Sequence, residues 1–283
     1  MSLRAALLAL LCFASTPALA GEPFLYKDGD MQLEGYMARA AEPGAPVVLI
    51  VHQWKGLGAY EKSRADMLAA AGYNAFAIDM YGQGIRPQTP EEAGKQASLY
   101  KNDPVLARQR VHAALETVRG MSSIGPSIAI MGYCFGGTMA LEAARAGEEL
   151  AAAISFHGGL STKAPAAENT VKAPLLVHHG ADDPFVPAAE VVAFEQEMQD
   201  AHARLTFYAY PGAVHSFTEK EAGNDPAKGA AYNEEADALS WQRSLSFLEK
   251  AFRKAGNEGN PAATPAPAPA TEKPAPESLT KTP

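Results

Sequence analysis

One short stretch, Ser127-Ile128-Ala129-Ile130-Met131-Gly132-Tyr133-Cys134-Phe135-Gly136-Gly137, constrains the fold of this chain more than any other. Its apolar first half is typical of a buried strand, and the residues after Gly137 have helical spacing. Between them, Gly132-x-Cys134-x-Gly136 has the pattern of a nucleophile elbow with cysteine at its centre. Such a turn crowds the strand against the helix, so only glycine fits two positions to either side of the nucleophile. The stretch therefore predicts helices packed on a sheet, with a thiol at a helix N-terminus.

Two interpretations of Cys134 stay open on this stretch alone. At a helix N-terminus the backbone N–H groups and the helix dipole favour a thiolate and a developing oxyanion, as a nucleophile requires. The alternative is an inert, buried cysteine in an ordinary strand-to-helix turn. The chain has 2 cysteines, and Cys12 lies in a segment that we expect to be removed. A lone thiol in an exported protein has no disulfide partner in the chain, which favours a functional role.

The N-terminal residues 1–20 have the pattern of a signal peptide. Arg4 supplies the positive charge, an apolar core follows, and Ala18-Leu19-Ala20 is a small-residue cleavage site. The apolar core is too short to span a membrane. We therefore expect residues 21–255 to form one exported domain, periplasmic or secreted, and residues 256–283 to form a disordered tail rich in Pro and Ala.

The charge balance excludes some partners. Lys and Arg number 24 against 32 Asp and Glu, and no basic patch interleaved with aromatic residues is present. This acidic chain is not expected to bind nucleic acid or an anionic membrane. Neither a dinucleotide-binding loop nor a Walker-type lysine is present, so no cofactor is expected. A monomer is the predicted state.

Apolar strands and helical segments alternate along the chain. Asp28-Gly29 predicts an N-terminal hairpin. Besides the elbow strand and the helix after Gly137, strands are expected at residues 45–52, 74–79, 150–157, 173–179 and 204–210. Helices are expected at 60–71, 104–120, 187–202 and 227–255, with a further helix start at Thr89-Pro90-Glu91-Glu92. This alternation predicts an α/β fold with a mostly parallel sheet and helices on both faces. No insertion large enough for a lid is evident.

Two polar motifs follow apolar strands at the expected carboxyl edge of the sheet, where open α/β sheets place their chemistry. Asp182 and Asp183 follow one strand, and His215 follows the next. His215 could take a proton from Cys134, and an aspartate could orient the imidazole. The motif leaves Asp182 and Asp183 as alternatives. His178 and His179 could be drawn as metal ligands, but adjacent strand residues point to opposite faces, so no metal site is predicted.

Taken together, these motifs resemble the dienelactone hydrolase family of α/β-hydrolases. The elbow, Gly180-x-x-Asp183-x-x-Val186-Pro187 and His215-Ser216-Phe217 carry the resemblance, with His52-Gln53-Trp54-x-Gly56-Leu57 and Asp79-Met80-Tyr81-Gly82. It covers residues 24–254 and implies an α/β-hydrolase fold. It also implies a Cys134-His215-Asp183 triad, with an oxyanion hole formed by the backbone N–H groups of Phe135 and Trp54.

Two positions depart from the family pattern and leave the substrate open. Gln53 stands where dienelactone-cleaving members carry a glutamate, and Gln83 stands about where they carry an arginine, with Arg86 nearby. Three further residues complete the expected substrate pocket with Gln53, Gln83 and Arg86: Tyr81, Phe156 and Phe217. The sequence therefore predicts a cysteine-dependent hydrolase of small esters or lactones that acts through an acyl-thioenzyme. The alternative is a non-catalytic binding or scaffold protein that retains the fold.

Overall fold

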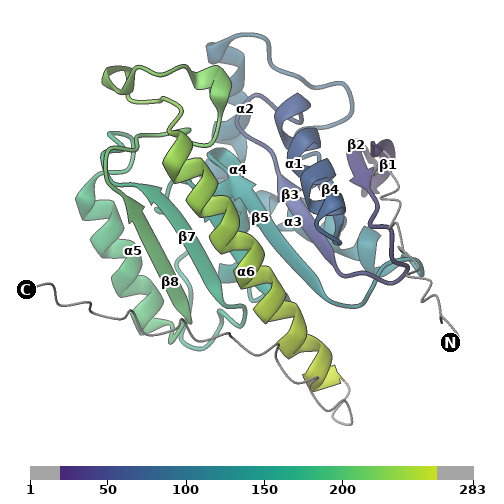
Figure 1. Cartoon of the computed structure of the whole chain (residues 1–283). Coiled ribbons are helices and arrows are strands. Elements are labelled where there is room, and N and C mark those ends of the chain that lie inside the picture. Colours follow the sequence, from purple (N-terminus) through teal and green to yellow (C-terminus); the bar gives the residue numbers. More distant parts are fainter. Residues whose placement is uncertain (1–19, 260–283) are drawn as a thin grey trace, which may run out of the picture.

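The computed structural model of the chain describes the backbone of residues 20–259 and the side chains as far as residue 256. The predicted signal peptide, except for its last residue, and nearly all of the predicted tail lie outside the described residues. The described residues form a single eight-stranded sheet with helices on both faces, which confirms the predicted α/β fold (Figure 1).

The strands lie in the order β1-β2-β4-β3-β5-β6-β7-β8. Their bounds are β1 Glu22–Asp28, β2 Met31–Ala38, β3 Val47–Val51, β4 Asn74–Ile78, β5 Ile128–Tyr133, β6 Ala152–Phe156, β7 Leu175–Gly180 and β8 Leu205–Tyr210. The predicted hairpin is confirmed, because β1 pairs antiparallel with β2 from Glu22↔Met37 to Asp28↔Met31. β2 is also antiparallel to β4, and the strands from β4 to β8 pair in parallel.

Six α-helices and two short 3₁₀ turns accompany the strands within the described residues. Their bounds are α1 Ala59–Ala70, α2 Pro90–Asn102, α3 Pro104–Arg119, α4 Phe135–Arg145, α5 Ala188–Asp200, α6 Glu234–Gly259, with the 3₁₀ turns η1 Lys220–Ala222 and η2 Pro226–Lys228. The predicted helix start at Thr89 is confirmed. The Thr89 hydroxyl accepts the Glu92 N–H at 3.2 Å, and the Glu92 carboxylate accepts the Thr89 N–H in return.

Two hydrophobic clusters lie on opposite faces of the sheet. Alternate residues of β5 divide between them: Ile128 and Ile130 pack with α2, α3, α4 and α5, whereas Ala129 and Met131 pack with α1 and α6. In Figure 1, α6 crosses the front of the sheet diagonally, and α1 lies on the same side. Because both faces are covered, β3, β4, β5, β6 and β7 are buried along their whole length.

The prediction for the last helix was wrong at both ends. α6 begins at Glu234 instead of residue 227, and it extends past Ala255 to Gly259. The segment between β8 and α6 instead forms a loop with the turns η1 and η2. Pro226 starts the second of these turns, and Gly229 ends it in the left-handed conformation, so the apparent helical spacing of this segment did not give a helix.

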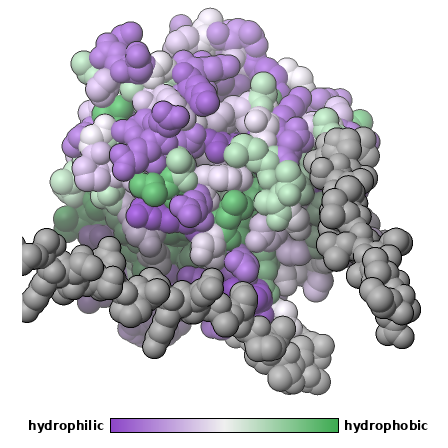
Figure 2. All heavy atoms as spheres, in the orientation of Figure 1, coloured by the Kyte–Doolittle hydropathy of each residue, from purple (hydrophilic) through white to green (hydrophobic). Residues whose placement is uncertain are grey.

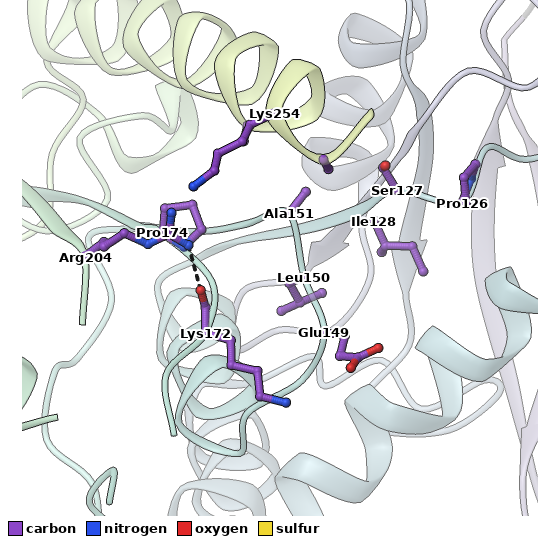
Figure 3. Close-up of a pocket in the computed structure, with 12 residues that line it drawn as sticks. Pro126, Ser127, Ile128, Glu149, Leu150, Ala151, Lys172, Pro174, Arg204 and Lys254 are labelled. Carbon is purple, nitrogen blue, oxygen red and sulfur yellow. Dashed lines mark hydrogen bonds between the residues drawn. The ribbon is translucent and has the colours of Figure 1, made fainter. Parts of the chain in front are cut away.

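On the outside, the face seen in Figure 2 mixes hydrophobic with hydrophilic residues. Within the part of the chain that the structure describes, no helix combines the length and the apolar character that crossing a membrane requires. A cavity of about 330 Å³ lies where β5, β6, β7 and β8 begin (Figure 3). Lys172 and Arg204 line it, and the Arg204 guanidinium donates to the Lys172 carbonyl at 2.8 Å. The predicted site residues lie at the other edge of the sheet, where these strands end.

Candidate active site

Cys134 lies between β5 and α4 in a strained backbone conformation. Its φ is +55° and its ψ is −118°, a combination that L-residues rarely adopt. A Cβ on Gly132 would collide with the carbonyl oxygen of Gly136, and a Cβ on Gly136 would collide with the carbonyl oxygen of Val51. Both glycines are therefore required by close backbone approach, as the sequence predicted. The turn holds the Cys134 side chain at the N-terminus of α4.

Three predicted side chains meet at the carboxyl edge of the sheet. The Sγ of Cys134 lies 3.0 Å from the Nε2 of His215. The other ring nitrogen, Nδ1, donates a hydrogen bond to Oδ2 of Asp183 at 2.8 Å, because a carboxylate only accepts. These side chains come from the ends of β5, β8 and β7, so the parallel sheet brings together residues that lie far apart in the sequence.

The structure decides between the two adjacent aspartates. The Asp183 side chain is fully buried, and its second oxygen, Oδ1, accepts the Phe185 N–H at 2.8 Å. Asp182 instead accepts the Gly212 N–H at 3.0 Å and ties together the loops that follow β7 and β8. Asp183 is therefore the residue in contact with His215, and Asp182 stabilises the adjoining loops.

The backbone around His215 is fixed by a short parallel bridge to Ala230. The His215 N–H donates to the Gly229 carbonyl at 3.1 Å, and the His215 carbonyl accepts the Ala231 N–H at 3.0 Å. Since the bridge lies outside the eight named strands, the loop from β8 to α6 contributes directly to the position of the imidazole.

The charges next to His215 stabilise its protonated form. Burial alone lowers the pKa of this imidazole, but the Cys134 sulfur and the Asp183 carboxylate raise it to about 10. The proton of His215 thus lies between the Cys134 sulfur and the Asp183 carboxylate. This arrangement is suited to a thiolate–imidazolium pair in which the imidazolium serves as a proton donor.

Two backbone amides at the carboxyl edge of the sheet have no acceptor among the described residues. They are the N–H groups of Trp54 and Phe135, the pair predicted as the oxyanion hole. Phe135 is the first residue of α4, so its N–H has no partner within the helix. The Trp54 carbonyl accepts the Tyr81 hydroxyl at 2.9 Å, which fixes the peptide group that follows Trp54. Such unpartnered amides can stabilise an oxyanion.

Of the predicted pocket residues, Gln53 and Tyr81 are buried close to the elbow. Gln53 directly precedes Trp54, and its side-chain amide forms no hydrogen bond within the described residues. Burial, followed by the charge of Cys134, raises the pKa of Tyr81, which keeps its hydroxyl protonated as a donor. The structure thus brings Tyr81 near the sulfur and leaves the polar end of Gln53 available.

Gln83 and Arg86 make other contacts. The Gln83 amide donates to Oε2 of Glu34 at 3.3 Å, on β2. The Arg86 guanidinium donates to the carbonyls of Ile85 and Glu34 and lies 3.6 Å from Oδ1 of Asp79. Both side chains therefore tie the loop after β4 to its surroundings, and neither contacts the three triad side chains.

The prediction that Phe156 and Phe217 line the substrate pocket was wrong. Phe156 is 1% exposed, and its ring stacks on Tyr133 at 4.5 Å in the cluster beneath α1 and α6. Phe217 is fully buried against His157 and Tyr210. Strand-end aromatic residues can point into the core as readily as toward a substrate, and the sequence alone does not distinguish the two directions.

Three residues near the site were missed by the sequence reasoning. The His157 ring contacts the elbow, the Glu61 carboxylate contacts the segment that contains Trp54, and the Phe185 ring lies edge-on to His215 at 5.5 Å with 61% of the residue exposed. The available signal was position alone: His157 and Phe185 follow strands at the carboxyl edge, and Glu61 is in the first turn of α1.

Within the described residues, no three His, Cys, Asp or Glu side chains are grouped to share a metal ion. His178 and His179 do point to opposite faces. His178 bonds Tyr210 and Ser244, whereas His179 packs against Phe207.

Comparisons with known proteins agree with this geometry. Residues 33–252 match the model of the dienelactone hydrolase family. A solved structure titled m3DLH is 31% identical, covers 83% of this chain and 99% of its own, and superposes with a TM-score of 0.78. The crystal structure of a dienelactone hydrolase-like promiscuous phosphotriesterase, P91, from metagenomic libraries is 30% identical over 81% of this chain and 97% of its own, with a TM-score of 0.76.

A curated relative gives the same result. The carboxymethylenebutenolidase of Pseudomonas putida is 27% identical over 214 residues, which cover 74% of this chain and 87% of the relative. The family match spans most of the chain, including all three triad positions and both predicted oxyanion-hole positions. The protein is an ester or lactone hydrolase, and the chain belongs to the dienelactone hydrolase family.

Proposed function

We propose that the protein is an exported, cysteine-dependent hydrolase of small esters or lactones that acts through an acyl-thioenzyme. The observation that carries this proposal is the contact of 3.0 Å between Cys134 Sγ and His215 Nε2. The same edge of the sheet holds two backbone amides that have no acceptor among the described residues. A thiolate is the reactive form of cysteine, and a neighbouring imidazolium stabilises it.

In the first half of the reaction, the Cys134 thiolate attacks the substrate carbonyl carbon and forms a C–S bond. The carbonyl π electrons move to oxygen, and the Trp54 and Phe135 N–H groups stabilise the resulting oxyanion. When this intermediate collapses, the carbon–oxygen bond to the leaving alcohol breaks, and His215 donates its proton to the departing oxygen.

In the second half, a water molecule attacks the thioester carbon while His215 accepts the water proton. A second oxyanion forms at the same amides, and its collapse breaks the C–S bond. The carboxylic acid leaves, and the thiolate–imidazolium pair is restored. Asp183 accepts the Nδ1 hydrogen bond throughout, which holds the imidazole in the tautomer that directs Nε2 toward the sulfur.

Intact-mass spectrometry tests this proposal directly. The reduced protein is mixed briefly with p-nitrophenyl acetate, alongside Cys134→Ala and His215→Ala variants. We expect a transient acetyl adduct on the wild-type protein, none on Cys134→Ala, and slow formation and clearance on His215→Ala. Hydrolysis by Cys134→Ala at the wild-type rate would overturn the proposal. Absence of both adduct and turnover would instead favour a binding role for the fold.

We further propose export, with cleavage after Ala20 and a monomeric mature protein. One contact supports the position of the cleavage site. The Gly21 N–H donates to Oδ1 of Asp66 at 3.0 Å, and the same carboxylate accepts the Tyr36 hydroxyl at 2.9 Å. Cleavage before Gly21 would turn that amide into an ammonium group and the hydrogen bond into an ion pair. Mass analysis of the secreted protein and light scattering test the two statements; a mature chain that begins elsewhere, or a dimer, would contradict them.

A further inference from the structure

Glu61 is a buried carboxylate that no step of the proposed reaction uses. It is the third residue of α1, and only 2% of it is exposed. Its Oε2 accepts the Gly58 N–H at 2.9 Å, and its Oε1 accepts the Gln53 N–H at 3.1 Å. The carboxylate therefore binds both ends of the segment 53–58, which contains the Trp54 amide.

Other buried groups hold the same segment. The Gln53 carbonyl accepts a hydrogen bond from Nδ1 of His52 at 2.6 Å, and the Tyr81 hydroxyl donates to the Trp54 carbonyl at 2.9 Å. The His52 tautomer is fixed because its Nε2 accepts the Met80 N–H at 3.1 Å. The Gln53 N–H, the Gln53 carbonyl and the Trp54 carbonyl are thus all hydrogen-bonded to side chains outside the segment. These side chains therefore determine the orientation of the Trp54 N–H.

A carboxylate is the group best suited to this position, because it can accept from two amides at once. A glutamine of the same shape offers one acceptor oxygen and one NH₂ donor, so one of the two backbone amides would face another donor. Burying a carboxylate is unfavourable, and burial raises the pKa of Glu61 in spite of the two amide hydrogen bonds. A charged group kept in such a place indicates a role that a neutral side chain would not fulfil.

We propose that Glu61 is a positioning residue for the oxyanion hole, and that it acts through the segment 53–58 to aim the Trp54 N–H at the oxyanion. This inference rests on the proposed function, because it assigns Glu61 to the same reaction. The competing explanation is that Glu61 only caps α1, as glutamate at the third helical position commonly does.

Glu92 provides a matched control for capping. It is also the third residue of its helix, α2, and its Oε2 accepts two backbone amides, from Gln88 at 2.8 Å and Thr89 at 3.4 Å. It is exposed, and it contacts none of the triad or oxyanion-hole residues. Glu92→Gln therefore has the same chemical change at a helix start without disturbing the segment 53–58.

Two reactions of Cys134 separate the oxyanion hole from the thiolate. Alkylation by iodoacetamide needs the thiolate but forms no oxyanion, whereas acylation by p-nitrophenyl acetate needs both. We expect Glu61→Gln to slow acylation and to lower kcat by about 10- to 100-fold, with KM and the alkylation rate changed by less than about twofold. Glu92→Gln should leave both reactions at the wild-type rate.

Glu61→Asp separates the two contacts of the carboxylate and serves if Glu61→Gln does not fold. Aspartate at this helix position still caps the Gly58 N–H, but its side chain is one methylene shorter and does not reach the Gln53 N–H. We expect slow acylation with normal alkylation, and a lower melting temperature because the buried Gln53 N–H loses its acceptor.

The outcomes distinguish this inference from the proposed function. Wild-type acylation rates in both Glu61 variants, or an equal loss of acylation and alkylation, would overturn the positioning role. A wild-type protein that is alkylated but never acylated at Cys134 would instead overturn the proposed function.

Discussion

The backbone N–H of Cys134 donates a hydrogen bond to Nδ1 of His157 at 3.1 Å, so a second histidine holds the backbone of the predicted nucleophile. The other nitrogen, Nε2, lies 2.9 Å from the Thr218 hydroxyl, which in turn lies 2.6 Å from the hydroxyl of Tyr60. Burial, followed by the positive charge of His215, lowers the pKa of His157 well below its usual value. The ring is therefore neutral, as an acceptor of the Cys134 N–H must be.

Replacement of His157 by Phe should weaken both the fold and the active site. The variant keeps an aromatic ring but removes one acceptor of the Cys134 N–H and the partner of Thr218. We expect the free energy of unfolding to fall by about 1–3 kcal/mol, because buried polar groups lose their partners. We also expect a lower kcat/KM. Urea denaturation and ester hydrolysis measure the two effects, with the exposed His202→Gln as a control. Unchanged values for both would contradict the role of this contact.

Adding a methyl group to a glycine of the elbow should destabilise the protein far more than adding one at an unobstructed position of a helix. In Gly136→Ala, the new methyl group would collide with the carbonyl oxygens of Val51 and His52. We expect a loss of more than about 3 kcal/mol of unfolding free energy, or no soluble protein. Gly94→Ala is the control, because nothing lies within 4 Å of its Cβ on α2. There we expect stabilisation by about 0.5–1 kcal/mol; similar losses in both variants would contradict the steric argument.

The pKa of His215 predicts the alkaline limit of activity. Since Cys134 and Asp183 raise this pKa to about 10, His215 carries its proton below pH 10 and loses it above that value. Activity should therefore fall as pH rises through about 10, because the leaving alcohol then receives no proton. Asp183→Asn should shift this limb to lower pH and reduce kcat by roughly 10²- to 10⁴-fold. A profile of kcat against pH measures both, and an unshifted limb in Asp183→Asn would be the contrary result.

Buried neutral histidines predict that stability declines on the acid side. Burial, with a smaller effect of Arg243, lowers the pKa of His178 to about 3, and its ring lies between Tyr210 and Ser244. In the unfolded chain this group protonates near its ordinary pKa of about 6.5. As pH falls below that value, the unfolded state binds a proton that the folded state does not, so unfolding becomes more favourable.

For His178 alone, the free energy of unfolding should fall by about 2 kcal/mol between pH 7.5 and pH 5, and it should lose almost nothing from this group above pH 7.5. Urea denaturation at several pH values measures the slope. His178→Gln, although less stable throughout, should show a smaller slope than the wild-type protein. An equal slope in the two proteins would show that other groups control the acid limb.

The contact between Gly21 and Asp66 predicts a difference between precursor and mature chains. In a chain that begins at Gly21, the ammonium group would pair with the Asp66 carboxylate, whereas a chain with additional N-terminal residues retains an amide there. We expect the mature form to be the more stable by up to about 1 kcal/mol, because the pair is partly exposed. Asp66→Asn should abolish that difference. Thermal melting of the four proteins provides the measurement.

Much of the fold and the triad could be predicted from the sequence, because the signals are local and strong. Continuous apolar runs such as Val47–Val51 predict strands covered on both faces, and the elbow glycines predict the close approach of β5 and α4. The position of Asp182 and Asp183 after their strand did not separate them, and only the family resemblance favoured Asp183, because the choice depends on which side chain of a tight turn faces His215. That direction is set by the neighbouring loops and not by residue type.

The residues that support the triad could not be predicted from local sequence patterns. His157 and Glu61 form hydrogen bonds to the backbone N–H groups of Cys134 and Gln53, which are 23 and 8 positions away in the chain. No local pattern specifies such partners, since they depend on how β6 and α1 pack on the sheet. The start of α6 was misplaced for a related reason. Helical spacing continues through residues 227–233, but the turn η2 and the bridge between His215 and Ala230 hold this segment in a loop.

The bridge that positions His215 also links catalysis to the integrity of one margin of the molecule. The thiol sits in the middle of the sheet, but its base is held by the loop that follows the edge strand β8. Margins of a protein open at lower free energy than the centre. Mild denaturant would thus detach the imidazole while the nucleophile remains in place, and hydrolysis would be lost before the helical circular dichroism signal. Loss of hydrolysis would therefore be an early sign that the loop after β8 has opened.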